Sequence, residues 1–371
     1  KKLKFHSIFS VEDTPNIDES VFSQHENELK LVFVDGNFNP TLSDDIQSID
    51  AKISLFSHDN QPDFINKLNK LTNEDPFVWL NTAFSRNVLL IQVEKNKIID
   101  RPIGIYHINS RECSFSNNLR VLVELDVNCE VTIFEKQVNY SDQQNYSNFV
   151  GEISVAKNAK LNYYRLLDEV NDLYHISNIF IEQQKSSVVN AYLLSTEGAM
   201  VRNNLNISLK GEGGQANMYG AYLLDNKVHV DNHTLVDHEV PNCNSNELYK
   251  GVLTGKSRGV FNGKIFVRED AQKTNAFQQN NNILLTDEAT IDTKPQLEIW
   301  ADDVKCSHGC TNGQLDEEAL FYLRSRGLDQ QQANALLLFA FIYEVFEKMG
   351  NQTYKEIFAK VVEEKLNSFN A

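Results

Sequence analysis

Short segments of alternating apolar and polar residues fill the chain from about residue 87 to residue 300, and Asn, Gly, Lys and Ser separate them. A period of two is typical of β-strands whose two faces meet different surroundings. No amphipathic helical segment of useful length interrupts this region. The pattern therefore predicts an all-β core.

Three stretches of this core share one form: an alternating strand, a polar turn and an aromatic-rich strand. They begin at Ile153, Ile179 and Ile207, which are almost evenly spaced along the chain. A step of the same length back from Ile153 reaches Leu125, in a similar stretch. Such a repeat favours a parallel β-helix of stacked coils, with Asn-rich corners because Asn tolerates left-handed backbone angles. A hairpin-built sandwich or several small sheets is the alternative, since either would give the same alternation in any one segment.

The residues before this core predict a small mixed α/β appendage. An apolar run at residues 29–34 indicates a strand, and helices are expected at residues 62–71 and 73–84. Asn73 or Asp75 would cap the second of these helices.

The C-terminal segment, residues 311–371, returns to helical periodicity. A first helix is expected to begin at the acidic residues after Asp316 and to end at Gly327. Two more are expected over residues 329–349 and 353–366. The predicted units are an N-terminal mixed appendage (1–86), a parallel β-helix core (87–310) and a C-terminal helical domain (311–371).

The chain is acidic, with 35 Lys and Arg against 51 Asp and Glu and a net charge of −16. This balance argues against binding to nucleic acid or to anionic lipid, both of which need a basic patch. The longest apolar run, residues 335–342, is far shorter than the roughly 20 residues that span a bilayer. We therefore expect protein partners, no nucleic acid and no membrane.

The cysteines are five in number and lack paired spacing, which argues against a disulfide framework although it leaves a single bridge open. They are Cys113, Cys129, Cys243, Cys306 and Cys310. The opening segment, KKLKFHSIFSVEDTP, holds no apolar run of signal-peptide length. Together these observations predict a reducing, cytoplasmic location.

Cys306, His308 and Cys310 are the strongest candidates for chemistry. At i, i+2 and i+4 of an extended strand, all three side chains would share one face. Two thiolates and one imidazole suit zinc, copper(I) or an iron–sulfur cluster, but a tetrahedral ion would need a fourth ligand, which an interface could supply. The alternative is that the cysteines fill small apolar spaces and the histidine makes a hydrogen bond at the rim. The residues alone leave both interpretations open.

Other candidate motifs are weaker. His229, His233, His238 and Cys243 have spacings that match no standard zinc pattern, and in a strand His238 would point away from the first two. We expect polar residues of the coil here. Residues 251–257 resemble a phosphate-binding loop but are one residue short and precede no helix, so a tight turn is expected. No hydrolase, protease or dinucleotide-binding motif is present, so no catalytic residues stand out.

Several longer stretches, taken together, resemble the SufB/SufD family of the SUF iron–sulfur cluster assembly machinery, over nearly the whole chain. They are PFVWLNTAF at residues 76–84, RPIGIYHI from Arg101, NHTLVDHEVPNCNSNELYKGVLTGKSRGVFNGKIFV from Asn232, and QKTNAFQQNNNILLTDEATIDTKPQLEIWADDVKCSHG from Gln272. CSHG followed by GQLDEEALFYLRSRG is similar to the SufD branch of that family.

The resemblance implies a right-handed parallel β-helix between an N-terminal appendage and a C-terminal helical domain, acting as a non-catalytic scaffold. Its functional positions fall on Cys306 and His308. In the family this histidine faces a cysteine of SufB across a heterodimer interface, where the nascent cluster or its iron is thought to form. Cys310 departs from the family pattern, which has a small residue there. It could be an added ligand, but we favour a space-filling role.

The resemblance also implies partners. The segment that contains Leu320, Leu323, Arg324 and Arg326 is similar to the surface on which the ATPase SufC docks. ATP hydrolysis by SufC would then rearrange the junction with SufB. In isolation, family members can form homodimers through the surface otherwise offered to SufB. Whether a flavin associates with the complex is left open.

Two other functions compete with the scaffold. Many β-helices act on polysaccharides, with carboxylates in a long groove. A purely structural assembly subunit is the other alternative, with Cys306 and His308 as packing residues.

Overall fold

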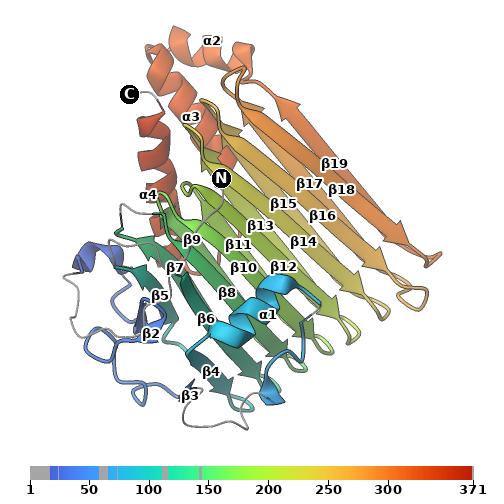
Figure 1. Ribbon diagram of the computed structural model, residues 1–371. Helices are drawn as coiled ribbons and strands as arrows, with labels where there is room; N and C mark the ends of the chain where they lie inside the picture. The colour runs from blue at the N-terminus through green and yellow to red at the C-terminus, as the bar shows by residue number, and fades with distance from the viewer. Residues whose placement is uncertain are drawn as a thin grey trace.

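The computed structural model describes residues 17–23, 25–57, 66–72, 74–110, 116–141 and 144–369. Its core is a β-solenoid in which consecutive strands of the chain alternate between two sheets (Figure 1). Each long strand pairs in parallel with the strand two places along, as β10 does with β8 and β12. Because neighbours in sequence lie in different sheets, a hairpin-built sandwich is excluded. The predicted parallel β-helix is confirmed.

Each coil of the solenoid contributes strands to both sheets. In spatial order the ten-stranded sheet contains β19 (Lys305–Gly313), β17 (Asn275–Leu284), β15 (Asn244–Leu253), β13 (Gln215–Leu224), β11 (Val188–Ser195), β9 (Lys160–Glu169), β7 (Glu130–Asn139), β5 (Ile103–Asn109), β1 (Leu29–Val34) and β2 (Asn37–Phe38). The nine-stranded sheet contains β18 (Thr290–Ile299), β16 (Arg258–Val267), β14 (His229–His238), β12 (Met200–Leu209), β10 (Tyr174–Gln183), β8 (Tyr146–Val155), β6 (Ser116–Leu125), β4 (Asn87–Val93) and β3 (Lys52–Ser57).

The repeat predicted from the sequence is two residues out of register at its middle member. Ile181, and not Ile179, pairs with Ile153 on one side and with Ile207 on the other. Side chains alternate between the two faces of a strand, so a shift of two residues leaves the same residues inside the solenoid.

Asparagines occupy the corners, as the sequence predicted. Asn96, Asn128 and Asn158 have φ values of 62°, 58° and 57°, in the left-handed region. Their side chains also form a ladder: the amide of Asn128 donates to Asn96 at 2.8 Å, and that of Asn158 donates to Asn128 at 2.9 Å. Each corner thus stabilises the corner of the next coil.

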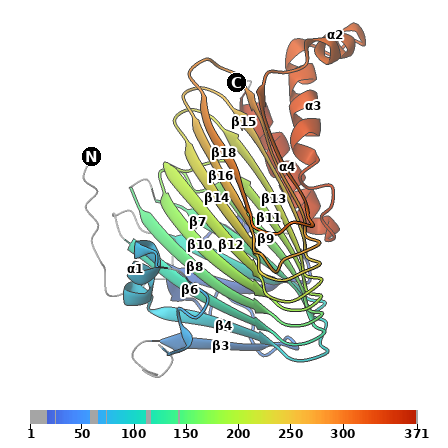
Figure 2. The ribbon, with the colours of Figure 1, turned by 90° about the vertical axis from the view of Figure 1, so that its right-hand side faces the viewer.

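The C-terminal helices are α2 (Glu317–Ser325), α3 (Gln330–Tyr343) and α4 (Gln352–Ser368). α3 and α4 lie along the outer face of the ten-stranded sheet (Figure 2). An aromatic column on that face receives α4, because the ring of Tyr354 stacks on Phe134 at 4.8 Å and lies 5.3 Å from Tyr164. No helix in the described part of the chain is both long and apolar enough to span a membrane.

The predicted end of the second C-terminal helix was wrong. α3 ends at Tyr343 and not at residue 349, and residues 344–349 form tight turns with bonds such as Met349 N to Phe346 O at 3.0 Å. These turns bury Val345 and Phe346 in the apolar cluster beneath the helices. Burial of these two side chains therefore overrides the helical periodicity of the sequence.

The N-terminal helix α1 (Pro76–Phe84) lies against the other sheet, whereas the 3-10 helix η1 (Glu19–Val21) packs on the outer face of the ten-stranded sheet. α1 follows its predicted cap, Asp75, whose side chain accepts from the backbone N–H groups of Phe77 and Val78. α1 packs on β6 and β8. Of the helix predicted at residues 62–71, residues 62–65 lie outside the described residues, and residues 66–71 form turns and no α-helix, so that part of the prediction was wrong.

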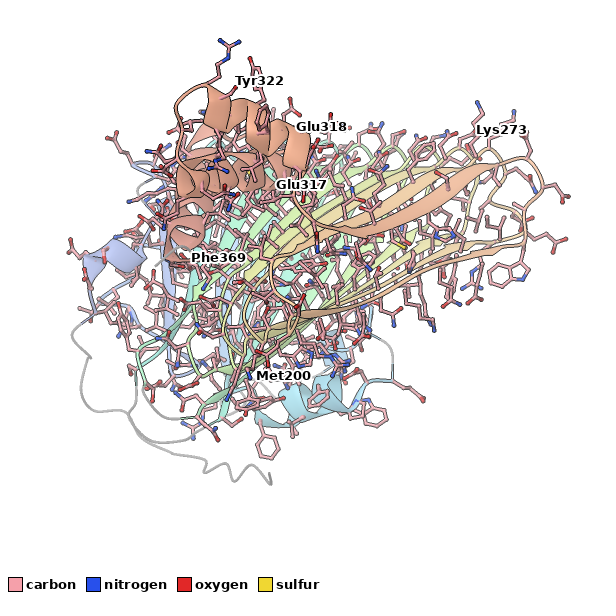
Figure 3. All side chains as sticks on the ribbon, turned by 90° about the horizontal axis from the view of Figure 1, so that it is seen from above. Met200, Lys273, Glu317, Glu318, Tyr322 and Phe369 are labelled. Atoms are coloured by element: carbon pink, nitrogen blue, oxygen red, sulfur yellow. The ribbon has the colours of Figure 1, made fainter. Side chains whose placement is uncertain are left out.

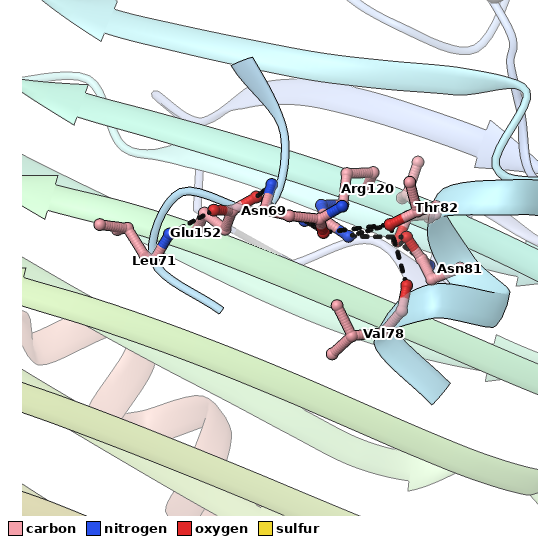
Figure 4. Close-up of polar contacts among 8 residues, drawn as sticks. Asn69, Leu71, Val78, Asn81, Thr82, Arg120 and Glu152 are labelled. Atoms are coloured by element: carbon pink, nitrogen blue, oxygen red, sulfur yellow. Dashed lines mark hydrogen bonds and ion pairs between the residues drawn. The ribbon is translucent and has the colours of Figure 1, made fainter. Parts of the chain in front are cut away.

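A buried ion pair fixes the segment before α1 to the sheet (Figure 4). The guanidinium of Arg120 is fully buried and bonds to the carboxylate of Glu152. Glu152 also accepts hydrogen bonds from the backbone nitrogens of Asn69 and Leu71, both at 2.9 Å. Arg120 donates in addition to Asn69 Oδ1 at 2.8 Å. The Arg120–Glu152 pair thus provides hydrogen-bond partners for the loop residues Asn69 and Leu71 and holds this loop on the sheet.

Inside the solenoid, a carboxyl group lies near the C-terminal end of the core. Glu247 on β15 is 3% exposed, and the amide of Gln278 donates to it at 2.6 Å. Burial raises the pKa of Glu247 to about 7, because the ionised form loses its hydration.

We expect Arg120→Met to destabilise the fold by about 3–5 kcal/mol, because Glu152 would remain as an uncompensated buried charge. Denaturant unfolding measures this loss. Lys97→Met is the control, since Lys97 pairs with Asp50 at a surface where both side chains are 40% or more exposed, and it should cost about 1 kcal/mol or less. Equal losses in the two variants would contradict the structural role of the buried pair.

Glu247 makes stability depend on pH. The unfolded carboxyl ionises near pH 4.5 and the folded one near pH 7, so the folded state loses stability as pH rises between these values. We expect Glu247→Gln to be more stable than the wild type at pH 8 by about 3 kcal/mol, with a gain that shrinks toward pH 4.5. Urea unfolding from pH 5 to pH 8 tests this, with the exposed Glu124→Gln as control. A pH-independent difference would refute the assignment.

Candidate functional site

The solenoid ends in an open coil. β18 and β19 are the outermost strands of their sheets at the same end, and within the described chain each pairs with a neighbouring strand on one side only. Figure 3 views the molecule from above, where α2, with Glu317, Glu318 and Tyr322, lies beside this terminal coil. A parallel edge strand presents unpaired N–H and C=O groups, so this end is a template for another strand.

The three candidate ligands lie on β19 and share its inward face, as the alternation predicted. Each pairs with a buried, inward-facing residue of β17. The pairs are Cys306 with Ala276, His308 with Gln278, and Cys310 with Asn280. Because no further coil covers them, His308 and Cys310 are exposed and Cys306 is half-buried. These side chains lie on the inward face of the strand and yet are open to solvent.

Cys306 has the most apolar surroundings of the three. It packs against the cluster that contains Ile265, Ala276 and Ala301, with Leu297 of β18 beside it. Burial raises the pKa of its thiol, so the sulfur keeps its proton at neutral pH. Coordination of a metal would have to displace that proton.

His308 lies above a polar pair. In the part of the chain that the structure describes, no side chain hydrogen-bonds its ring. Gln278, its strand partner, gives its amide nitrogen to Glu247, while the amide oxygen is buried and has no partner there. On the outer side of the same edge, a cavity of about 360 Å³ is lined by residues that include Phe277, Ser307 and Glu344.

The described part of the chain offers two candidate metal ligands close together on β19. Among the described residues, no three His, Cys, Asp or Glu side chains are grouped so that they could hold a metal ion. Cys306 and His308 can offer a thiolate and an imidazole, which suit iron, zinc or copper(I).

The second histidine group is split between the two faces of β14, as the alternation predicted. His233 lies on the outer face with its ring 2.8 Å from Asp231, and His229 lies on the same face. His238 points inward and shares a 2.9 Å hydrogen bond with Ser245. Burial lowers its pKa to about 4, so it is neutral at physiological pH.

The near-match to a phosphate-binding loop is a corner of the solenoid. It connects β15 to β16, and Gly255 has a φ of +63° there. Lys256 forms an ion pair with Glu288 at 2.7 Å. The tight turn that the sequence predicted is confirmed.

The four cysteines within the described chain are free. Cys129 and Cys243 are buried, and burial raises the pKa of the Cys129 thiol to about 11. Cys113 lies outside the described residues.

α2 projects from the body, and none of its residues is buried. Leu320 and Leu323 are half-buried, whereas Arg324 and Arg326 are exposed. The largest exposed apolar side chains of the helix are Phe321, at 75%, and Tyr322, at 57%. Neither ring was among the docking residues that the sequence predicted, which were Leu320, Leu323, Arg324 and Arg326.

Sequence reasoning also missed Gln278 and Glu247. They precede His308 by one coil and by two coils, and they share its column in the ten-stranded sheet. Counting back by the length of one coil and of two coils from His308 would have led to these residues.

Comparison with known proteins places this arrangement in a family. Residues 106–341 match the family described as SUF system FeS cluster assembly, SufBD core domain. The iron–sulfur cluster assembly protein SufD of Escherichia coli (strain K12) is 33% identical over 89% of this chain and 77% of its own length.

Two further relatives agree. The iron–sulfur cluster assembly SufBD family protein slr0076 of Synechocystis is 31% identical over 89% of this chain and 76% of its own length. The chloroplastic protein ABCI7 of Arabidopsis thaliana is 31% identical over 76% of this chain and 61% of its own length. The resemblance seen in the sequence is therefore confirmed, and the chain belongs to the SufB/SufD family of the SUF iron–sulfur cluster assembly system.

Proposed function

We propose that this chain is a non-catalytic scaffold subunit of an iron–sulfur cluster assembly complex. The open terminal coil is the observation that carries the proposal, because it combines unpaired strand edges with an exposed imidazole and a half-buried thiol. A partner strand could pair with β18 or β19 and cover these side chains at once. A site shared between two chains would form only in the assembled complex.

The partner in this proposal is a SufB protein, and the nascent cluster or its iron is the cargo held between the two chains. Cys306 and His308 supply this chain's ligands, and the partner supplies the others. Cys310 faces the same way above Asn280, so it is either a third ligand or a filler of the contact. The raised pKa of the Cys306 thiol keeps it protonated until the cargo or a base arrives.

In the proposal the C-terminal helices bind a second partner, the ATPase SufC. Their docking surface consists of Leu320, Leu323, Arg324 and Arg326, together with the exposed rings of Phe321 and Tyr322. Exposed aromatic and arginine side chains are the types enriched at protein interfaces. The proposal keeps the predicted units, an appendage (1–86), a β-helix core (87–310) and a docking domain (311–371), with β1 of the appendage paired to the core sheet.

The isolated chain would pair with a second copy through the same open end, in the absence of SufB. A cytoplasmic location stays a prediction. The proposal does not include a flavin. The polysaccharide-active enzyme is disfavoured by the family to which the chain belongs. A purely structural subunit is the alternative that the following experiment separates.

The test is anaerobic reconstitution of the chain with SufB and SufC, using iron and sulfide. We expect His308→Ala and Cys306→Ser each to lower the iron-dependent absorbance of the complex by about tenfold or more, since loss of a ligand should cost at least as much as loss of a residue that supports one. Cys310→Ser should have a smaller effect.

His233→Ala is the matched control, because it removes a half-buried histidine on the outer face of the other sheet. Co-purification of the three proteins must remain unchanged in every variant. Full absorbance in both His308→Ala and Cys306→Ser would leave only the structural subunit.

A further inference from the structure

A column of inward-facing side chains leads from the interior of the solenoid to His308. Strand register places Glu247 of β15 beside Gln278 of β17, and Gln278 beside His308 of β19. Glu247 is 3% exposed and Gln278 is 1% exposed. A carboxyl and an amide in a solenoid core are costly unless their polar atoms are used.

Glu247, one coil earlier, fixes the orientation of the Gln278 side-chain amide. Gln278 Nε2 donates to Glu247 Oε2 at 2.6 Å. The opposite strand makes room for this amide, because a Cβ atom at Gly263 would lie 2.3 Å from Gln278 Nε2. The amide oxygen, Gln278 Oε1, is then left buried without a partner among the described residues. A donor from the next position of the column would satisfy it.

The neighbouring positions on β17 offer nothing comparable. Ala276, below Cys306, has no polar side-chain atom. Asn280, below Cys310, is already engaged, since its amide donates to Tyr222 Oη at 3.0 Å and its oxygen accepts from Asn282 at 2.8 Å. The free acceptor therefore lies below the one candidate ligand that has a ring N–H to give.

We propose that Gln278 is a positioning residue for His308: its Oε1 accepts a hydrogen bond from one ring nitrogen of His308, and Glu247 holds the amide in the required orientation. The bond fixes one neutral tautomer and leaves the other nitrogen with a free electron pair. Ligand histidines in metal sites are oriented by such a bond from their second nitrogen. The use of the free nitrogen rests on the proposed function. The hydrogen bond needs only a rotation of the exposed His308 side chain toward Gln278 and no other molecule.

The test is the tautomer of His308 in the full chain, read from ¹⁵N chemical shifts of labelled histidine at a pH where the ring is neutral. His308→Asn identifies the signal by its loss. We expect the ratio of the two tautomers to differ about fivefold from that of the same chain unfolded in urea, as one ordinary hydrogen bond would give. Gln278→Leu should return the ratio to the unfolded value.

Gln279→Leu is the matched control, because Gln279 is the adjacent, exposed residue on the outer face of β17. It should leave the ratio unchanged. A wild-type ratio equal to that of the unfolded chain overturns the proposal, even if Gln278→Leu does not fold. A shifted ratio that survives in a folded Gln278→Leu also overturns it.

The tautomer measurement and the reconstitution experiment together separate this inference from the proposed function. A fixed tautomer in a wild-type chain whose His308→Ala variant still supports full cluster assembly would support the hydrogen bond and reject the ligand role. An unbiased tautomer with loss of assembly in His308→Ala would do the reverse.

Discussion

Backbone hydrogen bonds between successive coils hold this chain together, and in the described residues the last coil has no successor. Each long strand satisfies its polar backbone groups through the coils before and after it. At the start of the solenoid, β2 and β3 pair in antiparallel fashion with β1 and β4 and so cover the first coil. At the other end, β18 and β19 lack any such cover within the described chain. The candidate chemistry lies at the end where the ladder is unfinished.

The C-terminal helices connect that end to the rest of the body. α4 packs on the aromatic column of the ten-stranded sheet, whose last strand is β19. The hydroxyl of Tyr354 also donates to the buried Glu28 at 2.5 Å, next to the first strand of the same sheet. Burial raises the pKa of Glu28, and the hydroxyls of Tyr106 and Tyr354 partly offset this. A partner held by α2 and a partner held by β19 would therefore be linked through α3, α4 and this sheet.

Much of the fold could be predicted from local pattern, because period-two alternation and Asn corners are imposed within a few residues. The register of Ile181 could not, since a two-residue shift gives the same inside and outside faces. The end of α3 was missed because burial of Val345 and Phe346 is a tertiary effect. Cys306 and His308 were predicted to share a face, but Gln278 and Glu247 become their neighbours only when whole coils stack.

The most direct test of the account is amide hydrogen exchange of β18 and β19 in the monomeric chain and in its complex with SufB. The account predicts fast exchange in the monomer at those β19 amides that do not bond to β17, and strong protection of these amides in the complex. Protection confined to α1 or α2, with β18 and β19 unchanged, would contradict the claim that the unfinished coil is completed by a partner.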